Sequence, residues 1–409
     1  MRRILAIAIL LFFTVLQQVY AQTEIGLVLR KGQAKLTIPF SLVNNLIIIP
    51  VTLNNRLTLK FILDTGANNV ILTDKLFGDI MGLKYDRTMT ISGPGIVDSV
   101  STYVANDVTI ALSTGVRGRH ISMLVLEEDY IQLKKNLGED IFGIIGYDLF
   151  SRFIVEIDYD NLEVTFYDPN KFRAPRGYDI YQMDVENTKP YIQSIAYQGN
   201  AVDTMRLMID TGASHSLLLD MDESKVLTRP DSTLETSLGH GLGGEIPGKI
   251  GRLKELRIGN YQLHNILVSI PDSGAYSNAI KRGSRHGTIG GSTLSRFNPI
   301  FDYQGGKFYL RKSRHFKGPF KYDMSGVRIS YFEGPQRLEV TAITADSPAS
   351  EIGIQVGDVI RQVEGRNIYN SKLSEIYAVL KSRPGRLIKM DIRRNGEKLL
   401  FKFRLRHLI

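Results

Sequence analysis

The chain has 409 residues, of which 43% are hydrophobic and 23% are charged, with a formal net charge of +9 and no cysteine. These values are ordinary for a globular protein, and the length predicts two to three domains with sizeable cores. The absence of cysteine excludes thiol nucleophiles, thiolate metal sites and disulfides. Positive charge clusters only at Arg311–Lys321. We interpret this cluster as a solvated linker and expect no nucleic-acid partner, because no aromatic or glycine-rich nucleic-acid motif accompanies it.

The N-terminus has the layout of a secretory signal peptide. Two arginines precede an apolar run, Ile4–Leu16, which is interrupted only by Thr14, and Val19 and Ala21 stand where a signal peptidase reads small residues. The run is short for a membrane span, which needs about 20 apolar residues. We therefore expect residues 1–21 to be removed, leaving no stable membrane span, and the protein to be exported to the periplasm or secreted from the bacterial cell envelope. An uncleaved anchor is the alternative.

A nine-residue pattern occurs twice. Phe61–Asn69 reads FILDTGANN and Leu207–His215 reads LMIDTGASH, so that Asp64 and Asp210 lie 146 positions apart. Each acid ends an apolar run, and an isolated carboxylate is costly to bury there unless something compensates it. Because this unfavourable burial of a carboxylate would occur in both halves, the pattern suggests that the two acids compensate each other.

The repeat extends beyond these two motifs. Ile145–Phe153 (IGYDLFSRF) matches Ile289–Phe297 (IGGSTLSRF) at an offset of 144 residues. One unit therefore covers about residues 30–168 and the other about residues 178–312. A duplication this regular predicts two similar lobes.

Both units are expected to be β structure. In the first, Asn54-Asn55 separates two apolar β-branched runs, the second of which ends at the acid, and this pattern predicts a hairpin. In the second unit, Gly199-Asn200 occupies the turn of the corresponding hairpin. Helical periodicity is weak throughout the two units, although Asp74–Leu83 is expected to form a short helix or a turn.

The Asp-Thr-Gly triplets suggest an acid pair. Glycine lacks a Cβ, so two copies of such a loop can approach face to face, and the threonine hydroxyls can then donate hydrogen bonds across the join. Two carboxyls held together share one proton, so that the pair can act as base and acid at the same pH. Aspartic proteases are the established example of this effect. The residues are Asp64 and Asp210 as catalytic acids, supported by Thr65, Gly66, Thr211 and Gly212.

Other chemistries have weaker support. Either acid alone could be a structural turn residue, but two copies with matching downstream elements argue against that reading. His215 is expected to be a polar loop residue rather than a catalyst. The seven histidines show no metal-binding spacing, no serine triad is readable, and the glycine-rich Gly239–Gly244 lacks the context of a phosphate loop. We expect no metal and no cofactor.

These motifs resemble those of the pepsin-like and retropepsin-like aspartic proteases over about residues 30–312. That family combines each Asp-Thr-Gly with a flap hairpin and a downstream element of two hydrophobic residues followed by glycine. Here the flap and cleft residues would be Gly93, Pro94 and Gly95 in the stretch Ile91–Ile96, and Gly241 and Gly243 in the second half. The downstream elements would be Ile144-Ile145-Gly146 and Thr288-Ile289-Gly290. An inert turn is the alternative for Gly93–Gly95.

The chain also departs from the pepsin pattern. Ala67 and Ala213 follow the two glycines, as in retropepsins, and the pepsin flap tyrosine and disulfides have no counterpart. The resemblance therefore favours a single-chain, retropepsin-like bacterial branch. Alanine offers no hydroxyl to the carboxylates, so we expect the pKa values of the pair to be higher and the pH optimum less acidic than in stomach enzymes.

The C-terminal region resembles a PDZ domain of the kind found in bacterial proteases. The resemblance rests on Ser347–Ile360, on Val363–Ile368, and on an amphipathic helix at Ser371–Ser382 whose apolar face would contain Leu373, Ile376, Tyr377 and Leu380. Asn395-Gly396 predicts a hairpin turn. Such domains bind an extended peptide as an added strand. Ser325, Gly326 and Val327 stand where the resemblance places the peptide-binding loop, although they depart from its usual sequence.

The sequence thus predicts a mainly β protein: a two-lobed pepsin/retropepsin-like double β-barrel plus a small PDZ domain with two helices. The expected boundaries are 1–21 for the signal peptide, 22–170 and 178–314 for the lobes, and 322–408 for the PDZ domain. The expected function is an exported aspartic endopeptidase acting on protein or peptide substrates, with a PDZ domain that binds peptide or regulates access. A non-catalytic peptide receptor on the same scaffold is the alternative.

Overall fold

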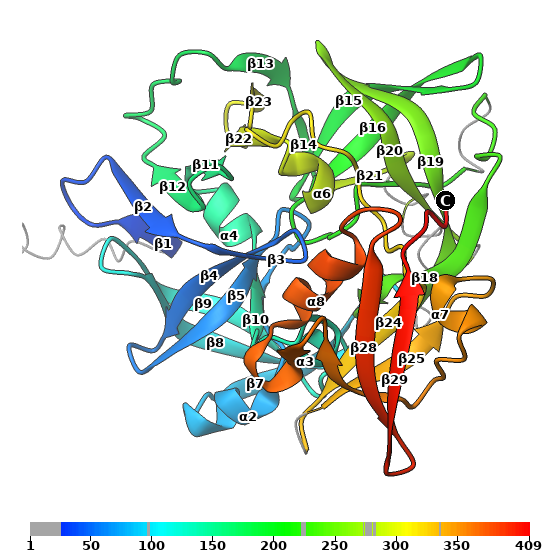
Figure 1. Ribbon diagram of the computed structural model, residues 1–409. Helices are drawn as coiled ribbons and strands as arrows, with labels where there is room; N and C mark the ends of the chain where they lie inside the picture. Colours follow the sequence, from blue (N-terminus) through cyan, green and yellow to red (C-terminus); the bar gives the residue numbers. More distant parts are fainter. Residues whose placement is uncertain are drawn as a thin grey trace, which may run out of the picture.

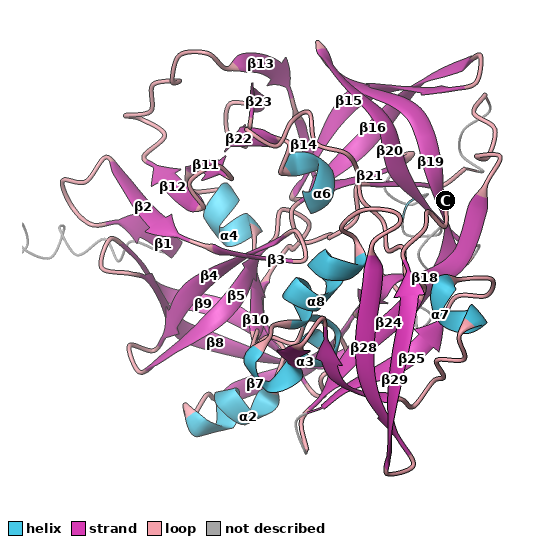
Figure 2. Ribbon diagram, viewed as in Figure 1, coloured by secondary structure: helices cyan, strands magenta, loops and turns pink. Residues whose placement is uncertain are grey.

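The computed structural model describes residues 26–95, 99–221, 226–272, 274, 280, 284–334 and 337–409. The predicted signal segment, residues 1–21, and Ile96 of the predicted flap lie outside this part of the chain. Strands dominate the described residues, and helices are few and short (Figure 2). The predicted fold class, mainly β with a PDZ domain, is confirmed. Among the described residues, no helix has both the length and the apolar character needed to cross a membrane.

The first lobe is built on one mixed sheet (Figure 1). Its strands are β1 (Gly26–Leu29), β3 (Ser41–Val43), β4 (Leu46–Leu53), β5 (Leu57–Leu63), β6 (Val70–Leu72), β7 (Tyr85–Ile91), β8 (Val100–Leu112), β9 (Val116–Leu126) and β10 (Gly143–Ile145). Their order is β1-β9-β6-β10-β5-β4-β8-β7, with β3 paired to β4. The helices of this lobe are α2 (Lys75–Ile80), α3 (Leu133–Leu137) and α4 (Tyr147–Phe150).

The second lobe repeats this plan. Its strands are β14 (Asp184–Glu186), β15 (Lys189–Gln198), β16 (Ala201–Asp210), β17 (Leu217–Leu219), β18 (Thr233–Gly241), β19 (Gly244–Ile258), β20 (Tyr261–Pro271) and β21 (Gly287–Gly290), followed by helix α6 (Gly291–Leu294). Their order is β14-β15-β16-β21-β17-β20-β19-β18. In both lobes the strand that ends at the acid lies parallel to the strand of the downstream glycine element: β5 beside β10, and β16 beside β21. The duplication seen in the sequence is therefore a duplication of structure.

The predicted turns are confirmed. Asn54 and Asn55 both have positive φ, 48° and 52°, as a tight hairpin between β4 and β5 requires. Gly199-Asn200 forms the two-residue connection between β15 and β16. The helix expected within Asp74–Leu83 is also present, as α2 (Lys75–Ile80). Asp74 caps its N-terminus by accepting a hydrogen bond from the backbone N–H of Leu76 at 2.9 Å.

A third sheet joins the lobes. It contains β2 (Lys35–Pro39), β11 (Ile154–Asp158), β12 (Glu163–Tyr167), β13 (Asp179–Gln182), β22 (Phe297–Asp302) and β23 (Lys307–Lys312). Its order is β13-β23-β22-β11-β12-β2, so strands of both halves meet at the β11–β22 pair. Phe150 packs edge-on against Phe301, with ring centroids 5.4 Å apart. One continuous hydrophobic core thus holds the lobes in a fixed relation.

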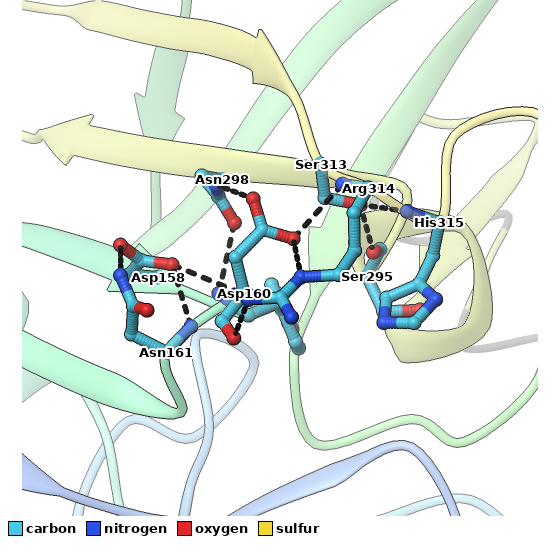
Figure 3. A network of polar contacts seen from close by, with 9 residues as sticks. Asp158, Asp160, Asn161, Ser295, Asn298, Ser313, Arg314 and His315 are labelled. Carbon is cyan, nitrogen blue, oxygen red and sulfur yellow. Dashed lines mark hydrogen bonds and ion pairs between the residues drawn. The ribbon is translucent and has the colours of Figure 1, made fainter.

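A polar network beside this sheet ties the end of the second lobe to the first (Figure 3). Asn298 donates to Asp160 at 2.8 Å and accepts the backbone N–H of Tyr159 at 2.9 Å. Asp160 also accepts from the backbone N–H of Arg314 at 2.9 Å. The interpretation of Arg311–Lys321 as a solvated linker is therefore only partly right. Lys317 and Lys321 are exposed, but Arg311 lies over the ring of Tyr178, and Phe316 packs on the core, 5.4 Å from the ring of Phe297.

The PDZ domain forms a separate sheet with its own core (Figure 1). Its elements are β24 (Val327–Phe332), β25 (Arg337–Ile343), α7 (Pro348–Glu351), β26 (Val359–Val363), β27 (Arg366–Asn367), the 3-10 helix η1 (Ile368–Asn370), α8 (Leu373–Leu380), β28 (Leu387–Arg394) and β29 (Glu397–Arg404). The strand order is β24-β25-β26-β28-β29, which leaves β24 at an edge. The predicted helix and the Asn395-Gly396 turn are confirmed, and the predicted apolar face of α8 packs on this core.

Candidate active site

Each acid is delivered to the join between the lobes by a strand and held there by the downstream glycine element. The backbone N–H of Asp64 donates to the carbonyl of Ile145 at 2.9 Å, just beyond the parallel pairing of β5 with β10. A Cβ on Gly146 would lie 1.9 Å from the carbonyl oxygen of Asp64, and one on Gly290 would lie 2.3 Å from that of His215. Glycine is required at both positions because backbone atoms occupy the space of a side chain.

The two threonines lock the loops together. The Thr65 hydroxyl donates to the carbonyl of Ile209 at 2.7 Å and accepts from the backbone N–H of Thr211 at 3.0 Å. Thr211 mirrors this arrangement, donating to the carbonyl of Leu63 at 2.7 Å and accepting from the backbone N–H of Thr65 at 3.0 Å. Both side chains are buried. The predicted hydrogen bonds across the join are therefore present, in both directions.

The glycines of the triplets bring the two carboxyl groups together. Asp64 accepts the backbone N–H of Gly66 at 2.6 Å, and Asp210 accepts that of Gly212 at 2.9 Å. A Cβ on Gly212 would lie 2.2 Å from the carboxyl carbon of Asp64, and one on Gly66 would lie 3.0 Å from a carboxyl oxygen of Asp210. Each glycine therefore makes room for the acid of the opposite lobe, as the sequence predicted.

The electrostatics of the pair follow from this proximity. Burial raises the pKa of Asp64 well above its usual range, and the charge of Asp210 and a hydrogen bond to its side chain raise it further. The Gly66 N–H and the charge of Lys189 oppose the shift. A buried carboxyl beside a second one holds its proton because both cannot be charged at low cost. The pair can therefore carry one proton and one negative charge over a range of pH values above those of an isolated aspartate.

The predicted flap residues of the two lobes meet. The Gly243 backbone N–H donates to the carbonyl of Pro94 at 2.8 Å, and Gly95 and Gly243 form a parallel bridge. A Cβ on Gly93 would lie 2.7 Å from Leu242, and one on Gly241 would lie 2.3 Å from the Pro94 carbonyl oxygen. These residues lie at the tips of the β7–β8 and β18–β19 hairpins. Leu242 packs on an apolar cluster that includes residues of β5 and β10, the strands that position Asp64, and this placement favours a flap over an inert turn.

The structure adds residues that the motifs did not reveal. The Tyr303 hydroxyl contacts the Thr65 carbonyl at 3.5 Å, beneath the dyad loops. Lys189 interacts electrostatically with both acids. His215, expected to be a loop residue, follows the second triplet, and burial lowers its pKa to about 4 despite the opposing charge of Asp210. Lys189 can be recognised only from the strand registers, which place it where the first lobe has Leu46.

The predicted PDZ loop is filled by the chain itself. The Asp323 carboxylate accepts the backbone N–H of Gly326 at 2.6 Å and that of Ser325 at 3.2 Å. Ser325 and Val327 are buried, and the backbone N–H of Val327 donates to the Ser325 hydroxyl at 3.2 Å. Two backbone N–H groups of this loop are thus bonded to an internal carboxylate, and the role of Ser325, Gly326 and Val327 in peptide binding stays a prediction.

The PDZ domain contacts both lobes. Lys372, which caps α8, pairs with Glu139 of the first lobe at 2.8 Å, and Lys134 of α3 pairs with Glu333 beside β24 at 2.5 Å. On the other side, Arg328 of β24 reaches the flap hairpin of the second lobe. It pairs with Glu245 of β19 at 3.1 Å and donates to Thr236 of β18 at 2.8 Å.

Comparisons with known proteins agree with this architecture. Residues 49–149 and 195–293 match the aspartyl protease family, and residues 339–394 match the PDZ domain family. The chain is a two-lobed aspartyl protease-like protein with a PDZ domain. The two matched segments of the aspartyl protease family contain Asp64 and Asp210, one in each lobe.

Two individual proteins show weaker similarity to this aspartyl protease-like chain. A probable CtpA-like serine protease of Staphylococcus haemolyticus (strain JCSC1435) is 20% identical over 167 residues, which cover 41% of this chain. The match spans 31% of that relative's length. The crystal structure of Basic 7S globulin from soybean is 10% identical with a TM-score of 0.38, covering 72% of this chain and 98% of the globulin chain.

The raised pKa of Asp64 predicts how stability depends on pH. The folded carboxyl binds its proton more tightly than the unfolded one, so its contribution to stability is complete below about pH 4 and is lost as pH rises through the folded pKa. Asp64→Asn should therefore flatten the decline of the thermal midpoint above pH 4, relative to the parent protein. Thermal unfolding between pH 3 and pH 8 checks this, with Asp79→Asn, an exposed acid in α2, as control. Parallel curves for the parent and Asp64→Asn would contradict it.

Proposed function

We propose that this protein is an exported aspartic endopeptidase in which Asp64 and Asp210 hydrolyse peptide bonds. The observation that supports this most directly is the pair of adjacent, half-buried carboxyl groups, each delivered by an equivalent loop of one lobe. The ionised member would remove a proton from a water molecule, and the protonated member would polarise the scissile carbonyl. The threonine bonds would keep the carboxyl groups in register while the proton moves between them. No covalent intermediate is needed.

The alternative is a peptide receptor that uses the same lobes without chemistry. A receptor has no need for a buried acid pair whose desolvation is unfavourable, whereas the hydrolytic mechanism requires it. Incubation of the purified protein with a peptide library, followed by mass spectrometry, distinguishes the two. Cleavage within peptides that resists serine-directed acylating reagents supports the proposal. Binding without cleavage, or loss of cleavage on serine acylation, would contradict it.

We also propose that the PDZ domain regulates access to the cleft. PDZ domains capture a peptide beside an edge strand, which here is β24. The hydroxyl of Tyr377 on α8 accepts the backbone N–H of Ile329 at 2.8 Å and donates to its carbonyl at 3.1 Å, so it occupies β24 groups that an added strand would use. Helix α3 of the first lobe packs on the same strand. Regulation is thus better supported than recruitment, because the groove is already engaged.

Weakening the contact between Arg328 of the PDZ domain and the flap hairpin of the second lobe should increase kcat/KM for short peptides. Arg328→Ala removes the bonds to Glu245 and Thr236, which tether the flap hairpin of the second lobe to the PDZ domain. The ion pair is partly exposed and worth about 1 kcal/mol at most, so we expect kcat/KM for a short peptide to rise by about two- to fivefold. Lys398→Ala is the matched control, since Lys398 pairs with Asp391 inside the PDZ sheet. Unchanged or reduced turnover in Arg328→Ala alone would reject regulation through the flap.

A further inference from the structure

The matching registers of the two lobes identify equivalent positions around the acids. In the first lobe, Ile62 of β5 pairs with Ile48 of β4, and continuing this ladder by two residues places Leu46 opposite Asp64. In the second lobe, Met208 of β16 pairs with Tyr191 of β15, and the same step places Lys189 opposite Asp210. The parallel pairings of Ile62 with Ile144 and of Met208 with Thr288 extend the equivalence to β10 and β21.

The sheet face next to the acid is apolar in the first lobe. Its side chains form one buried cluster on which Leu242 and Ile91, from the two flap hairpins, also pack. The cluster includes Val43, Leu46, Ile62, Leu124 and Ile141, and the partly buried Ile144 packs against it. Such a face suits apolar substrate side chains.

Much of the same face is polar and basic in the second lobe, although Leu218, which corresponds to Ile71 of the first-lobe cluster, is apolar and buried. The equivalent positions are, in the same order, Glu186, Lys189, Met208, Ser269, Arg285 and Thr288. The equivalence of Ile141 and Arg285 is supported by their neighbours, since the N–H of Phe142 donates to the Lys60 carbonyl as the N–H of His286 donates to the Arg206 carbonyl, both at 2.9 Å. Five of the six apolar residues are thus replaced by polar or charged ones, although the backbone is the same.

Among the described residues, Arg285 has no partner suited to its charge. Its side chain is buried, with the residue only 7% exposed, against 3% for Ile141 at the equivalent position. One guanidinium nitrogen faces the thioether of Met208, which is a weak acceptor, and Nε has no hydrogen-bond partner among the described residues. The hydroxyl of Thr288, on strand β21 just after Arg285 in the chain, is buried and equally unsatisfied within the described chain. Buried unpaired groups of this kind are strongly unfavourable unless a ligand completes them.

The charges around Arg285 leave a net positive face. Burial and Arg285 lower the pKa of Lys189, and its attraction to Asp210 and Asp64 raises it, so these groups lie close together. Glu186 on this face is paired with Arg206 at 2.7 Å. His215 is neutral at neutral pH, since its pKa is about 4. Two cations therefore face the single negative charge that the acid pair carries.

We infer that the second-lobe half of the cleft is a subsite for a carboxylate of the peptide substrate, bound by Arg285 and Lys189 with Thr288 as a hydroxyl partner. The inference rests on the proposed function in so far as the occupant is a peptide being cleaved. An arginine fork matches a carboxylate with two parallel hydrogen bonds, and burial strengthens that pairing. The first-lobe half remains apolar, so the enzyme selects an apolar residue on one side of the scissile bond and a carboxylate on the other.

The carboxylate can come from two sources, an Asp or Glu side chain or the C-terminus of the peptide, and the experiment separates them. Three matched peptides are compared, in which the tested position carries Glu, carries Gln, or is the C-terminal residue. The parent protein is measured alongside Arg285→Ile and Lys189→Leu, the latter two installing the residues of the first lobe. Arg56→Leu, in the exposed β4–β5 turn, controls for loss of one positive charge.

A charge-assisted hydrogen-bond pair should favour Glu over Gln by about 10- to 100-fold in kcat/KM. Arg285→Ile should bring this ratio close to one, Lys189→Leu should reduce it, and Arg56→Leu should preserve it. Preference for the C-terminal peptide alone would support the subsite and assign its source to the α-carboxylate. Cleavage with no acidic preference, or a preference that both substitutions leave intact, would overturn the inference while leaving the proposed function standing.

Binding measured without turnover separates failure of the subsite from failure of the enzyme. Fluorescence polarisation with the same labelled peptides is carried out on Asp64→Asn. Tighter binding of the carboxylate peptides, lost on adding Arg285→Ile, supports the subsite even where the parent protein cleaves nothing. In that case the proposed function is wrong and the subsite belongs to a receptor. Equal binding of all three peptides would overturn the subsite. If Arg285→Ile does not fold, Lys189→Leu supplies the same comparison.

Discussion

We expect Asp64→Asn and Asp210→Asn each to lower kcat/KM for peptide cleavage by at least about a thousandfold, and the double variant to be no worse than either single one. The reason is that the pair acts as one unit: a shared proton requires two carboxyl groups, and an amide at either position cannot exchange it. The buried bonds of Thr65 and Thr211 remain in each variant, so folding should persist. Turnover of a short peptide, with circular dichroism on the same samples, measures both expectations.

Asp79→Asn serves as the control for this result, because Asp79 is an exposed acid that pairs with Lys75 in α2. It should cleave at the parental rate. A single dyad variant that is folded and keeps more than a few per cent of the parental kcat/KM would reject the shared-proton mechanism. Losses that add up in the double variant would also reject it, since they would mean that the two acids act independently.

The sequence predicted the parts of this site that are local. Asp-Thr-Gly is a contiguous motif, and its repetition alone indicated two loops that meet; the cross-lobe bonds of Thr65 and Thr211 follow from that symmetry. The hairpins at Asn54-Asn55 and Asn395-Gly396 were readable because the turn residues adopt positive φ with little strain. Such features depend on neighbouring residues, which a linear pattern retains.

The features that were missed depend on distant pairings. The significance of Arg285 and Lys189 becomes clear only when they are compared with Ile141 and Leu46 at the equivalent positions of the first lobe. That comparison requires the register of several strands. The joining sheet was also not predicted, since its central pair, β11 with β22, links strands more than a hundred residues apart. Phe316 was assigned to a linker because the charges around it dominate the composition of Arg311–Lys321. Tertiary packing decides whether such charges face water or meet an acid.

The threonine pair should be as important for stability as the acids are for activity. Thr211→Val keeps the shape of the side chain but removes the donor to the Leu63 carbonyl and the acceptor for the Thr65 N–H. Both partners are then buried and unsatisfied, so we expect the free energy of unfolding to fall by about 2–4 kcal/mol. Thr211→Ser, which keeps the hydroxyl, should lose far less. Urea unfolding followed by circular dichroism compares the two variants with the parent protein.

A matching substitution at Thr65 tests whether the two threonines stabilise the join between the lobes as one unit. Thr65→Val removes the equivalent donor to the Ile209 carbonyl and the acceptor for the Thr211 N–H. The two threonines share one join between the lobes, so the loss in the double valine variant should be smaller than the sum of the single losses. Purely additive losses would mean that each hydroxyl stabilises its own loop and that the lobes are held together by the joining sheet instead. In that outcome, the decrease in kcat/KM, expressed as a free energy, should be smaller than the decrease in the free energy of unfolding. The reason is that the carboxyl groups would keep their relative positions.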